Sequence, residues 1–96
     1  MKSAASLKAK AIAGNIRKIR GFRNYTQDYL AAKLGISQNA YSKLELGYSK
    51  LTLERLFDVS TILDVEIMQI LNFQENEFLQ SASAEENVLQ LSQDAN

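Results

Sequence analysis

The stretch from Thr26 to Gly47, TQDYLAAKLGISQNAYSKLELG, constrains the fold of this chain more than any other part of its sequence. It contains two short amphipathic segments that meet at Gly35. The Thr26 hydroxyl can accept a hydrogen bond from a free amide of the first segment, and Gly35 suits the left-handed conformation that ends a helix. Ser37 can cap the second segment, and Gly47 can stop it. The stretch therefore predicts two helices, the first running to residue 34 and the second ending near residue 46.

The short connection between these segments determines how they pack. A link of three residues, Gly35-Ile36-Ser37, leaves little room for the helices to lie antiparallel, so they should cross at a steep angle. Ala31 stands where two steeply crossing helices need a small side chain. Tyr41 and Leu44 share one side of the second helix, and we expect that side to face the core. Together these features predict a helix-turn-helix motif.

The other side of the second helix carries only amide, hydroxyl and ammonium groups. Gln38, Asn39, Ser42 and Lys43 lie there, because 38/42 and 39/43 are i, i+4 pairs. Amides of Gln and Asn can form two hydrogen bonds with adenine, and a Lys ammonium can reach guanine. On its own, a polar stripe of this kind is most often an ordinary solvated face. Its interpretation as a base-reading surface depends on the rest of the chain.

Charge is divided unevenly along the sequence. Residues 1–50 contain ten Lys and Arg against two acids, whereas residues 51–96 contain one Arg against nine acids. The formal net charge is zero and the pI is about 6.2. Exposed charges act over only about 8–10 Å at physiological salt, so the local excess matters more than the average. The division predicts one basic face suited to an anionic polymer.

The organisation of the whole chain follows from its length and patterning. Ninety-six residues, 46% of them apolar, suit one small domain, and the absence of Pro and of sustained strand-like alternation predicts an all-α fold. We expect residues 1–10 to be a flexible basic arm or an early helical turn, 11–73 a helix-turn-helix domain, and 74–96 a polar tail. Further helices are expected at about 11–23 and 53–63, with a short one after residue 65. Their predicted inward-facing residues are Ile12, Ile16, Ile19 and Phe22, then Leu53, Leu56, Phe57, Ser60 and Leu63, then Ile67, Met68, Ile70 and Leu71.

The polar tail contains one local helix signal. Ser83-Ala84-Glu85-Glu86 matches a capping box ahead of Val88, Leu89 and Leu91, which predicts one more short helix near 84–92. Its apolar stripe is thin. The segment is therefore either disordered or stabilised by packing, for example on a second copy of the chain as a dimerisation helix.

Several classes of function are disfavoured by what the sequence lacks. Cys and His are absent, which removes disulfides, thiolate and imidazole metal ligands and the commonest general base. There is no Gly-rich phosphate loop and no evident pair of catalytic acids. We expect no enzyme activity, no metal and no cofactor. No apolar run approaches the roughly 18 residues of a membrane span, and no apolar block near the N-terminus indicates secretion, so we expect a cytoplasmic protein.

Residues from about 12 to 71 resemble a known family of regulators. The resemblance is carried by IRKIR ahead of TQxxLAxKLGISQ, followed by LExG, TLxxL and IMQIL. These motifs are similar to those of the lambda-repressor-like, Cro-type helix-turn-helix domain of the XRE family in prokaryotes and phages. The resemblance implies five helices, the third lying in the major groove of double-stranded DNA.

The resemblance also implies roles for individual residues. Gln27 corresponds to a phosphate anchor, and Arg20 and Glu45 correspond to a structural salt bridge rather than to DNA contacts. Gln38, Asn39 and Lys43 match base-reading positions, with Ser42 beside them. The free amides at the start of a helix suit phosphate, which adds Ser37. The remaining candidate phosphate contacts are Arg23, Tyr48, Ser49 and Lys50, although any one exposed cation could serve solubility alone.

Four residues depart from the family pattern. Tyr41 replaces the usual Ile or Val, which could shift the third helix slightly, and Leu46 stands where a polar residue often meets the DNA backbone. Asp64 and Glu66 replace the residues that usually start the fifth helix, which should weaken that start.

The sequence therefore predicts a sequence-specific regulator of transcription that binds double-stranded DNA. We expect a homodimeric repressor that reads a palindromic operator through the helix at 37–46, because one small domain makes few base contacts. An alternative is a protein-interaction module, such as an antitoxin or phage-switch partner, whose acidic half covers a basic protein partner. Such a module could also bind DNA.

Overall fold

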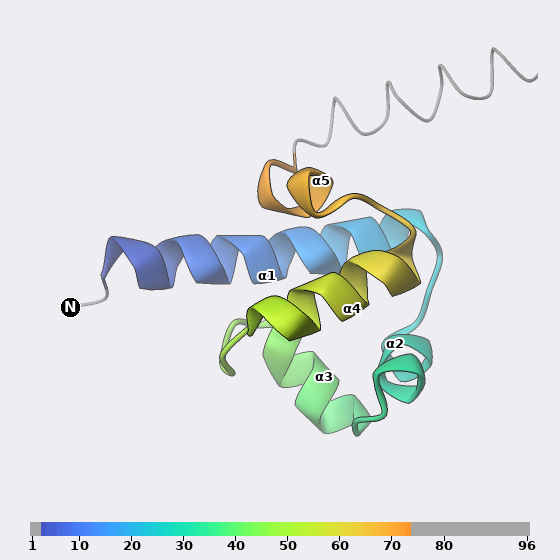
Figure 1. Cartoon of the computed structure of the whole chain (residues 1–96). Helices are drawn as coiled ribbons and strands as arrows, with labels where there is room; N and C mark the ends of the chain where they lie inside the picture. Colours follow the sequence, from blue (N-terminus) through green and yellow to red (C-terminus); the bar gives the residue numbers. More distant parts are fainter. Residues whose placement is uncertain (1–2, 74–96) are drawn as a thin grey trace, which may run out of the picture.

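Five helices form the part of the chain that the computed structural model describes, residues 3–73 (Figure 1). They are α1 (Ala4–Phe22), α2 (Gln27–Leu34), α3 (Gln38–Glu45), α4 (Leu53–Leu63) and α5 (Ile67–Leu71). The long α1 runs through the middle, with α5 on one side and α2 and α3 on the other. The predicted all-α fold class is confirmed.

The first four helices each begin with a Ser or Thr that caps their free amides. The hydroxyl oxygens of Ser3, Thr26, Ser37 and Thr52 accept hydrogen bonds of 3.0–3.1 Å from the amide three residues on. Each bond satisfies a donor that has no partner within its helix. The caps predicted at Thr26 and Ser37 are confirmed.

The start of α1 differs from the prediction. The helix begins at Ala4 rather than near residue 11, so residues 4–10 are helical turns and not an arm. Ala, Lys and Leu are strong helix formers, and Ser3 supplies the cap. Of the two alternatives that the sequence left open for residues 1–10, an arm or an early helical turn, the structure shows helix from Ala4. The predicted helix start near residue 11 was wrong because residues 4–10 contain no Ile to mark an inward face.

The connection between α2 and α3 has the predicted geometry. Gly35 is left-handed at φ 70°, and the Ile36 amide donates to the Ala31 carbonyl at 3.0 Å, which closes the end of α2. Ala31 is buried, as a close helix crossing requires. Gly47, at φ 76°, ends the turn after α3 in the same left-handed conformation.

The core contains one cluster of buried side chains drawn from all five helices. Its members are Ile16, Ile19, Leu30, Ala31, Tyr41, Leu44, Leu56, Val59, Leu63 and Ile70. Most of these were predicted. Five predicted core residues are wrong: Leu53, Phe57 and Met68 are 67%, 54% and 61% exposed, and Phe22 and Leu71 are 36% exposed each.

The error on α4 has a simple geometric cause. Leu56, Val59 and Leu63 follow one another at three and four residues and form the buried stripe. Phe57 lies one position beyond Leu56, about 100° further round the helix, and therefore faces solvent. Val59, which was not predicted, takes the inward position.

Side chains also tie the helices together through backbone carbonyls. Asn15 Nδ2 donates to the Ile70 carbonyl at 2.9 Å and joins α1 to α5. At the start of α5, Asp64 adopts a left-handed φ of 55°, and the Gln69 side chain accepts from the Glu66 amide at 2.8 Å. Asp64 and Glu66 thus form a regular helix start although both depart from the family pattern.

Candidate nucleic-acid interface

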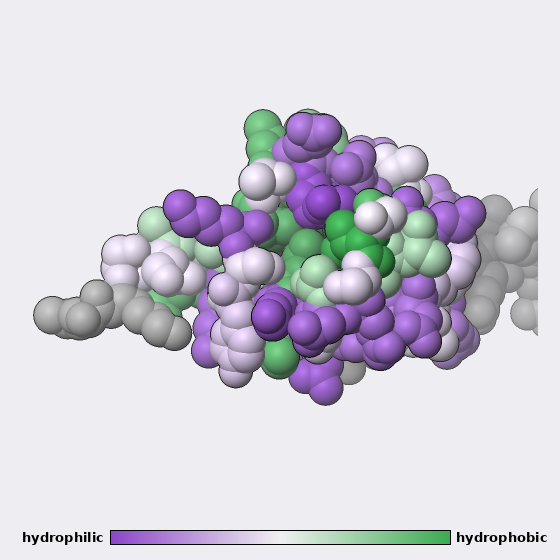
Figure 2. All heavy atoms as spheres, turned by 90° about the horizontal axis from the view of Figure 1, so that it is seen from below, coloured by the Kyte–Doolittle hydropathy of each residue, from purple (hydrophilic) through white to green (hydrophobic). Residues whose placement is uncertain are grey.

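Helix α3 presents its polar side to solvent and its apolar side to the core. Gln38, Asn39 and Lys43 are exposed, whereas Tyr41 and Leu44 are buried. Ser42 is half-buried between the two sides. Figure 2 views the molecule from the side where α2 and α3 lie, and this face is mainly hydrophilic around a smaller apolar area. The two sides of α3 are arranged as the sequence predicted.

A buried carboxylate holds α3 in place. Glu45 is 3% exposed, and its two oxygens accept hydrogen bonds from Nε and Nη2 of Arg20 on α1. Gln27 Nε2 at the start of α2 donates to the same carboxylate at 3.0 Å, and Arg20 Nη1 donates to the Tyr25 carbonyl at 2.8 Å. The salt bridge of Arg20 and Glu45 is confirmed. It fixes the orientation of α3 relative to both α1 and α2.

The charge states of this cluster follow from its contacts. Burial alone would raise the pKa of Glu45, but the hydrogen bonds that its carboxylate accepts from Arg20 and from the Gln27 amide lower it below the ordinary value. Burial, followed by the nearby Glu45 carboxylate, raises the pKa of Tyr41 above its ordinary value. Glu45 is therefore ionised and Tyr41 neutral at physiological pH.

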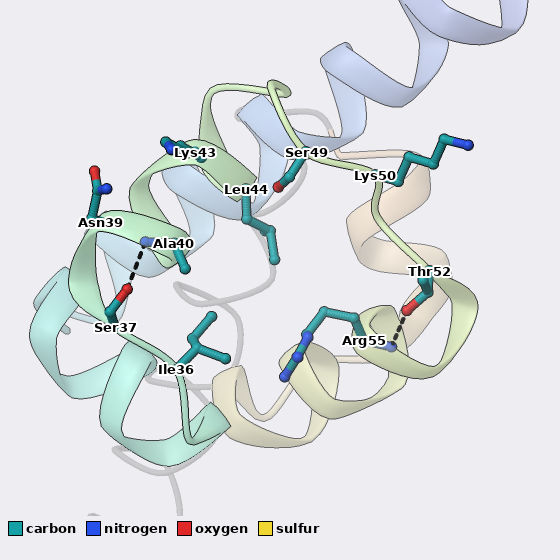
Figure 3. A pocket seen from close by; sticks show the side chains of 10 residues that line it. All are labelled: Ile36, Ser37, Asn39, Ala40, Lys43, Leu44, Ser49, Lys50, Thr52 and Arg55. Carbon is teal, nitrogen blue, oxygen red and sulfur yellow. Dashed lines mark hydrogen bonds between the residues drawn. The ribbon is translucent and has the colours of Figure 1, made fainter.

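A groove lies between α3 and α4, on the side where the polar residues of α3 are exposed (Figure 3). Asn39 and Lys43 stand on its α3 edge, while Arg55 reaches across from α4 toward Ile36. Lys50 lies on the connection between the two helices. Within residues 3–73 no acidic side chain lines this groove, which we call the α3–α4 groove. Its lining residues are Ile36, Ser37, Asn39, Ala40, Lys43, Leu44, Ser49, Lys50, Thr52 and Arg55.

Two helix starts open into the α3–α4 groove. The caps Ser37 of α3 and Thr52 of α4 both line it. Helix starts carry partial positive charge from their free amides, and the lining adds three cationic side chains. The groove is therefore electrostatically suited to phosphate.

The structure brings together five of the predicted contact residues in the α3–α4 groove: Ser37, Asn39, Lys43, Ser49 and Lys50. Gln38 is exposed on α3 outside the groove lining, and Tyr48 is 73% exposed on the neighbouring connection. Gln27 is half-buried, with its amide nitrogen on Glu45. Its role at a phosphate stays a prediction.

Arg23 has a structural role that the sequence did not reveal. Its guanidinium donates to the carbonyls of Leu63 and Asp64 at 3.0 Å each and so satisfies the C-terminal end of α4. This arrangement explains Arg23 without a phosphate, so its predicted phosphate contact gains no support.

Arg55 was missed by the sequence interpretation. Its Nη1 donates to the Leu34 carbonyl at the end of α2, at 3.3 Å, while its side chain lines the α3–α4 groove. A signal was present, since Arg55 is the single cation among the last 46 residues. Its inclusion in a basic surface nevertheless depends on how α4 packs against α2.

No group of three or more potential Asp, Glu, His or Cys ligands comes together in residues 3–73. No helix in this range is both long enough and apolar enough to cross a membrane.

Comparisons with known proteins agree with this geometry. A family model described as Helix-turn-helix matches residues 16–70. YqaE of Bacillus subtilis (strain 168), an uncharacterized HTH-type transcriptional regulator, is 38% identical over 63 residues, which are 66% of this chain and 54% of YqaE. The chain thus spans about half the length of this curated relative.

Two crystal structures of the clp gene regulator ClgR from Corynebacterium glutamicum are also similar. One superposes with a TM-score of 0.64 and 25% identity, covering 67% of this chain and 83% of that one. The other has a TM-score of 0.66 and 22% identity, covering 91% and 93%, and supports the fold alone.

Proposed function

Because the chain belongs to the helix-turn-helix family, whose model matches residues 16–70, we propose that it binds double-stranded DNA sequence-specifically and regulates transcription. One observation carries the proposal: the exposed polar side of α3 borders the α3–α4 groove, whose lining among residues 3–73 includes Lys43, Lys50 and Arg55 and no acid. The buried Glu45 cluster holds α3 rigidly in that position.

In the proposed complex, α3 enters the major groove and the two kinds of contact have separate tasks. Gln38, Asn39, Ser42 and Lys43 read base edges, because amides and ammonium groups match the adenine and guanine patterns there. Ser37, Tyr48, Ser49 and Lys50 contact phosphates, with Gln27 at the start of α2. Phosphate contacts supply affinity and orientation, and the base contacts supply sequence choice.

We further propose that the protein acts as a homodimeric repressor in the cytoplasm of a prokaryotic cell, associated with the nucleoid when bound. An α3 of eight residues offers few base contacts, and a dimer doubles them by reading two half-sites about 34 Å apart. Residues 74–96, with the predicted dimerisation helix near 84–92, lie outside the described residues. They remain our candidate for the dimer contact.

The experiment that tests DNA binding is selection of duplexes from a random pool by the full chain. We expect the enriched sequences to converge on one palindromic site. A pool that stays random after repeated rounds, at a salt concentration where bound duplex is still recovered, would contradict sequence-specific binding. An enriched site without two-fold symmetry would contradict the dimer but not the DNA-binding proposal.

The second candidate function is that of a protein-interaction module. A polar groove on the side of the molecule away from α3 favours it. Ser60, Thr61, Asp64, Val65, Glu66 and Gln69 line a shallow polar groove there, and its two charged residues are acidic. A basic protein could cover it. Copurification of the full chain with the product of a neighbouring gene would support this function, and DNA binding could coexist with it.

A further inference from the structure

A second groove lies between the first turns of α1 and the connection that follows α3. Its charged lining residues are Lys10 and Lys50, and Ser6, Tyr48 and Ser49 add hydroxyl groups. Within residues 3–73 no acidic side chain lines it. We call it the α1 groove, and its remaining lining residues are Ala5, Ala9, Ala13, Gly47 and Leu51.

A close backbone contact fixes the position of Lys10 in this groove. Gly47 packs against Lys10 so closely that a Cβ on Gly47 would lie 3.2 Å from Lys10 Cα and 2.9 Å from Lys10 Cγ. The α1 backbone and the connection after α3 are therefore in direct contact at this point. Lys10 is exposed, and its aliphatic stem lies over the connection.

The α1 groove continues from the α3–α4 groove. Ser49 and Lys50 line both, so the connection they belong to forms a wall that the two grooves share. Lys43 stands on one side of that wall and Lys10 on the other. Figure 1 shows the first turns of α1 extending beyond this connection.

All charged side chains in the sequence around Lys10 are positive. No acidic residue occurs before Asp28, whereas seven Lys and Arg do. Lys10 also precedes residue 16, where the match to the family model begins. The α1 groove is thus built partly from a segment outside the matched domain.

We infer that Lys10 binds a phosphate of the same DNA backbone that crosses the connection at Ser49 and Lys50, which makes the α1 groove a second phosphate site. The inference rests on the proposed function. A backbone lying along the α3–α4 groove and crossing its Lys50 wall meets Lys10 next, and an ammonium there would release a counterion from the DNA. Such a contact adds affinity and orientation but no sequence preference.

The test compares Lys10→Met with Lys18→Met. The first removes the ammonium but keeps an apolar stem over Gly47, and the second makes the same change at an exposed Lys of α1 that does not line the groove. The probe is the duplex enriched by selection, extended by a helical turn on each side. Binding is measured between about 50 and 200 mM salt.

We expect Lys10→Met to reduce the magnitude of the slope of log affinity against log salt by about 0.9 per chain bound. When the salt is raised over this range, the fold loss of affinity should therefore be about three to four times smaller for Lys10→Met than for the parent. Lys18→Met should keep the parental slope, and Lys10→Arg should restore it. Ethylation interference should show a phosphate whose ethylation weakens the parent but not Lys10→Met.

A parental slope for Lys10→Met, or an equal loss in Lys18→Met, would overturn the inference while leaving the proposed function intact. If the parent itself enriches and binds no duplex, the proposed function fails, and the inference fails with it. A change in base preference in Lys10→Met would also overturn the inference, because a phosphate contact carries no sequence information.

Discussion

The Glu45 side chain connects three helices of the candidate interface. Its carboxylate joins α3 to Arg20 of α1 and to Gln27 of α2, and it is shielded from solvent. A buried charge of this kind is costly when it loses its partner, because the remaining ion stays desolvated. The cluster therefore makes the position of α3 dependent on one ion pair.

We predict that Glu45→Gln destabilises the protein by about 3 kcal/mol, since Arg20 would lose its counterion at a site that is only 16% exposed. Urea unfolding at neutral pH measures the effect. The matched control is Glu54→Gln on the exposed first turn of α4, which should cost less than about 1 kcal/mol. Equal losses in the two variants would contradict the structural role of Glu45.

The same carboxylate makes stability depend on pH. The folded pKa of Glu45 lies below its ordinary value, so its contribution is complete above the unfolded pKa of about 4.3 and is lost as pH falls through the lower folded pKa. We predict that thermal stability falls more steeply with acidification in the parent than in Glu45→Gln. Parallel pH profiles would contradict this assignment.

Lys43 and Lys50 should behave differently although both line the α3–α4 groove. We predict that Lys43→Ala costs about 1–3 kcal/mol in binding to the selected duplex and relaxes its preference at one base, because Lys43 lies on α3. Lys50→Ala should weaken all sequences equally and reduce the salt slope by about one. Titration of the selected and single-base-changed duplexes separates the outcomes, and identical profiles for the two variants would contradict the division of tasks.

At the scale of elements, two glycines in the left-handed conformation end α2 and the turn after α3. Gly35 has open space around its Cα, whereas a Cβ on Gly47 would meet the backbone of Lys10. The first glycine is required by conformation alone. The second is required by both conformation and packing.

We predict that Gly35→Ala destabilises by about 1–2 kcal/mol through backbone strain, and that Gly47→Ala costs more because strain and contact add. Urea unfolding of both variants gives the comparison. A smaller loss for Gly47→Ala would show that α1 moves away from the connection at little cost, which would also weaken the case for a fixed α1 groove.

The orientation of α4 about its own axis gives another test at this scale. Leu56 is 7% exposed and Phe57 is 54% exposed. We predict that Leu56→Ala destabilises by about 2–5 kcal/mol, as large-to-small core changes do. Phe57→Ala, an equally drastic truncation one position along, should cost less than about 1 kcal/mol. Equal losses or the reverse order in thermal or urea unfolding would contradict the observed orientation of α4.

At the scale of the whole molecule, charge and symmetry determine how the protein would meet DNA. The basic excess lies in residues 1–50, which include α1, α2, α3 and the shared wall of both grooves, whereas α4 and α5 lie in the acidic half. Electrostatic attraction should therefore orient the protein with its α3 side toward DNA, and high salt should weaken this attraction.

We predict two chains per selected palindromic duplex, measured by sedimentation of the full chain with that duplex. A duplex with one half-site scrambled should bind far more weakly, because the second α3 loses its base contacts. A single chain per duplex, or equal affinity for the scrambled one, would contradict the dimeric arrangement.

Sequence alone determined the features that depend on neighbouring residues. The caps at Thr26 and Ser37, the left-handed Gly35, the small Ala31 at the crossing and the two sides of α3 all follow from hydrogen bonds and steric limits within a few positions. These local rules were sufficient to predict the motif and the exposed candidate contacts. They also led to the family resemblance, which implied the bridge between Arg20 and Glu45.

Features that depend on which elements meet became clear only from the packing of the helices. The structure showed that α1 begins at Ala4, that Phe57 faces solvent, that Arg23 closes the end of α4, and that Arg55 and Lys10 line grooves. All but the start of α1, which local helix propensity and the Ser3 cap explain, depend on contacts between residues distant in sequence. An apolar or charged side chain can face several directions on a helix, and only packing against the other elements selects one.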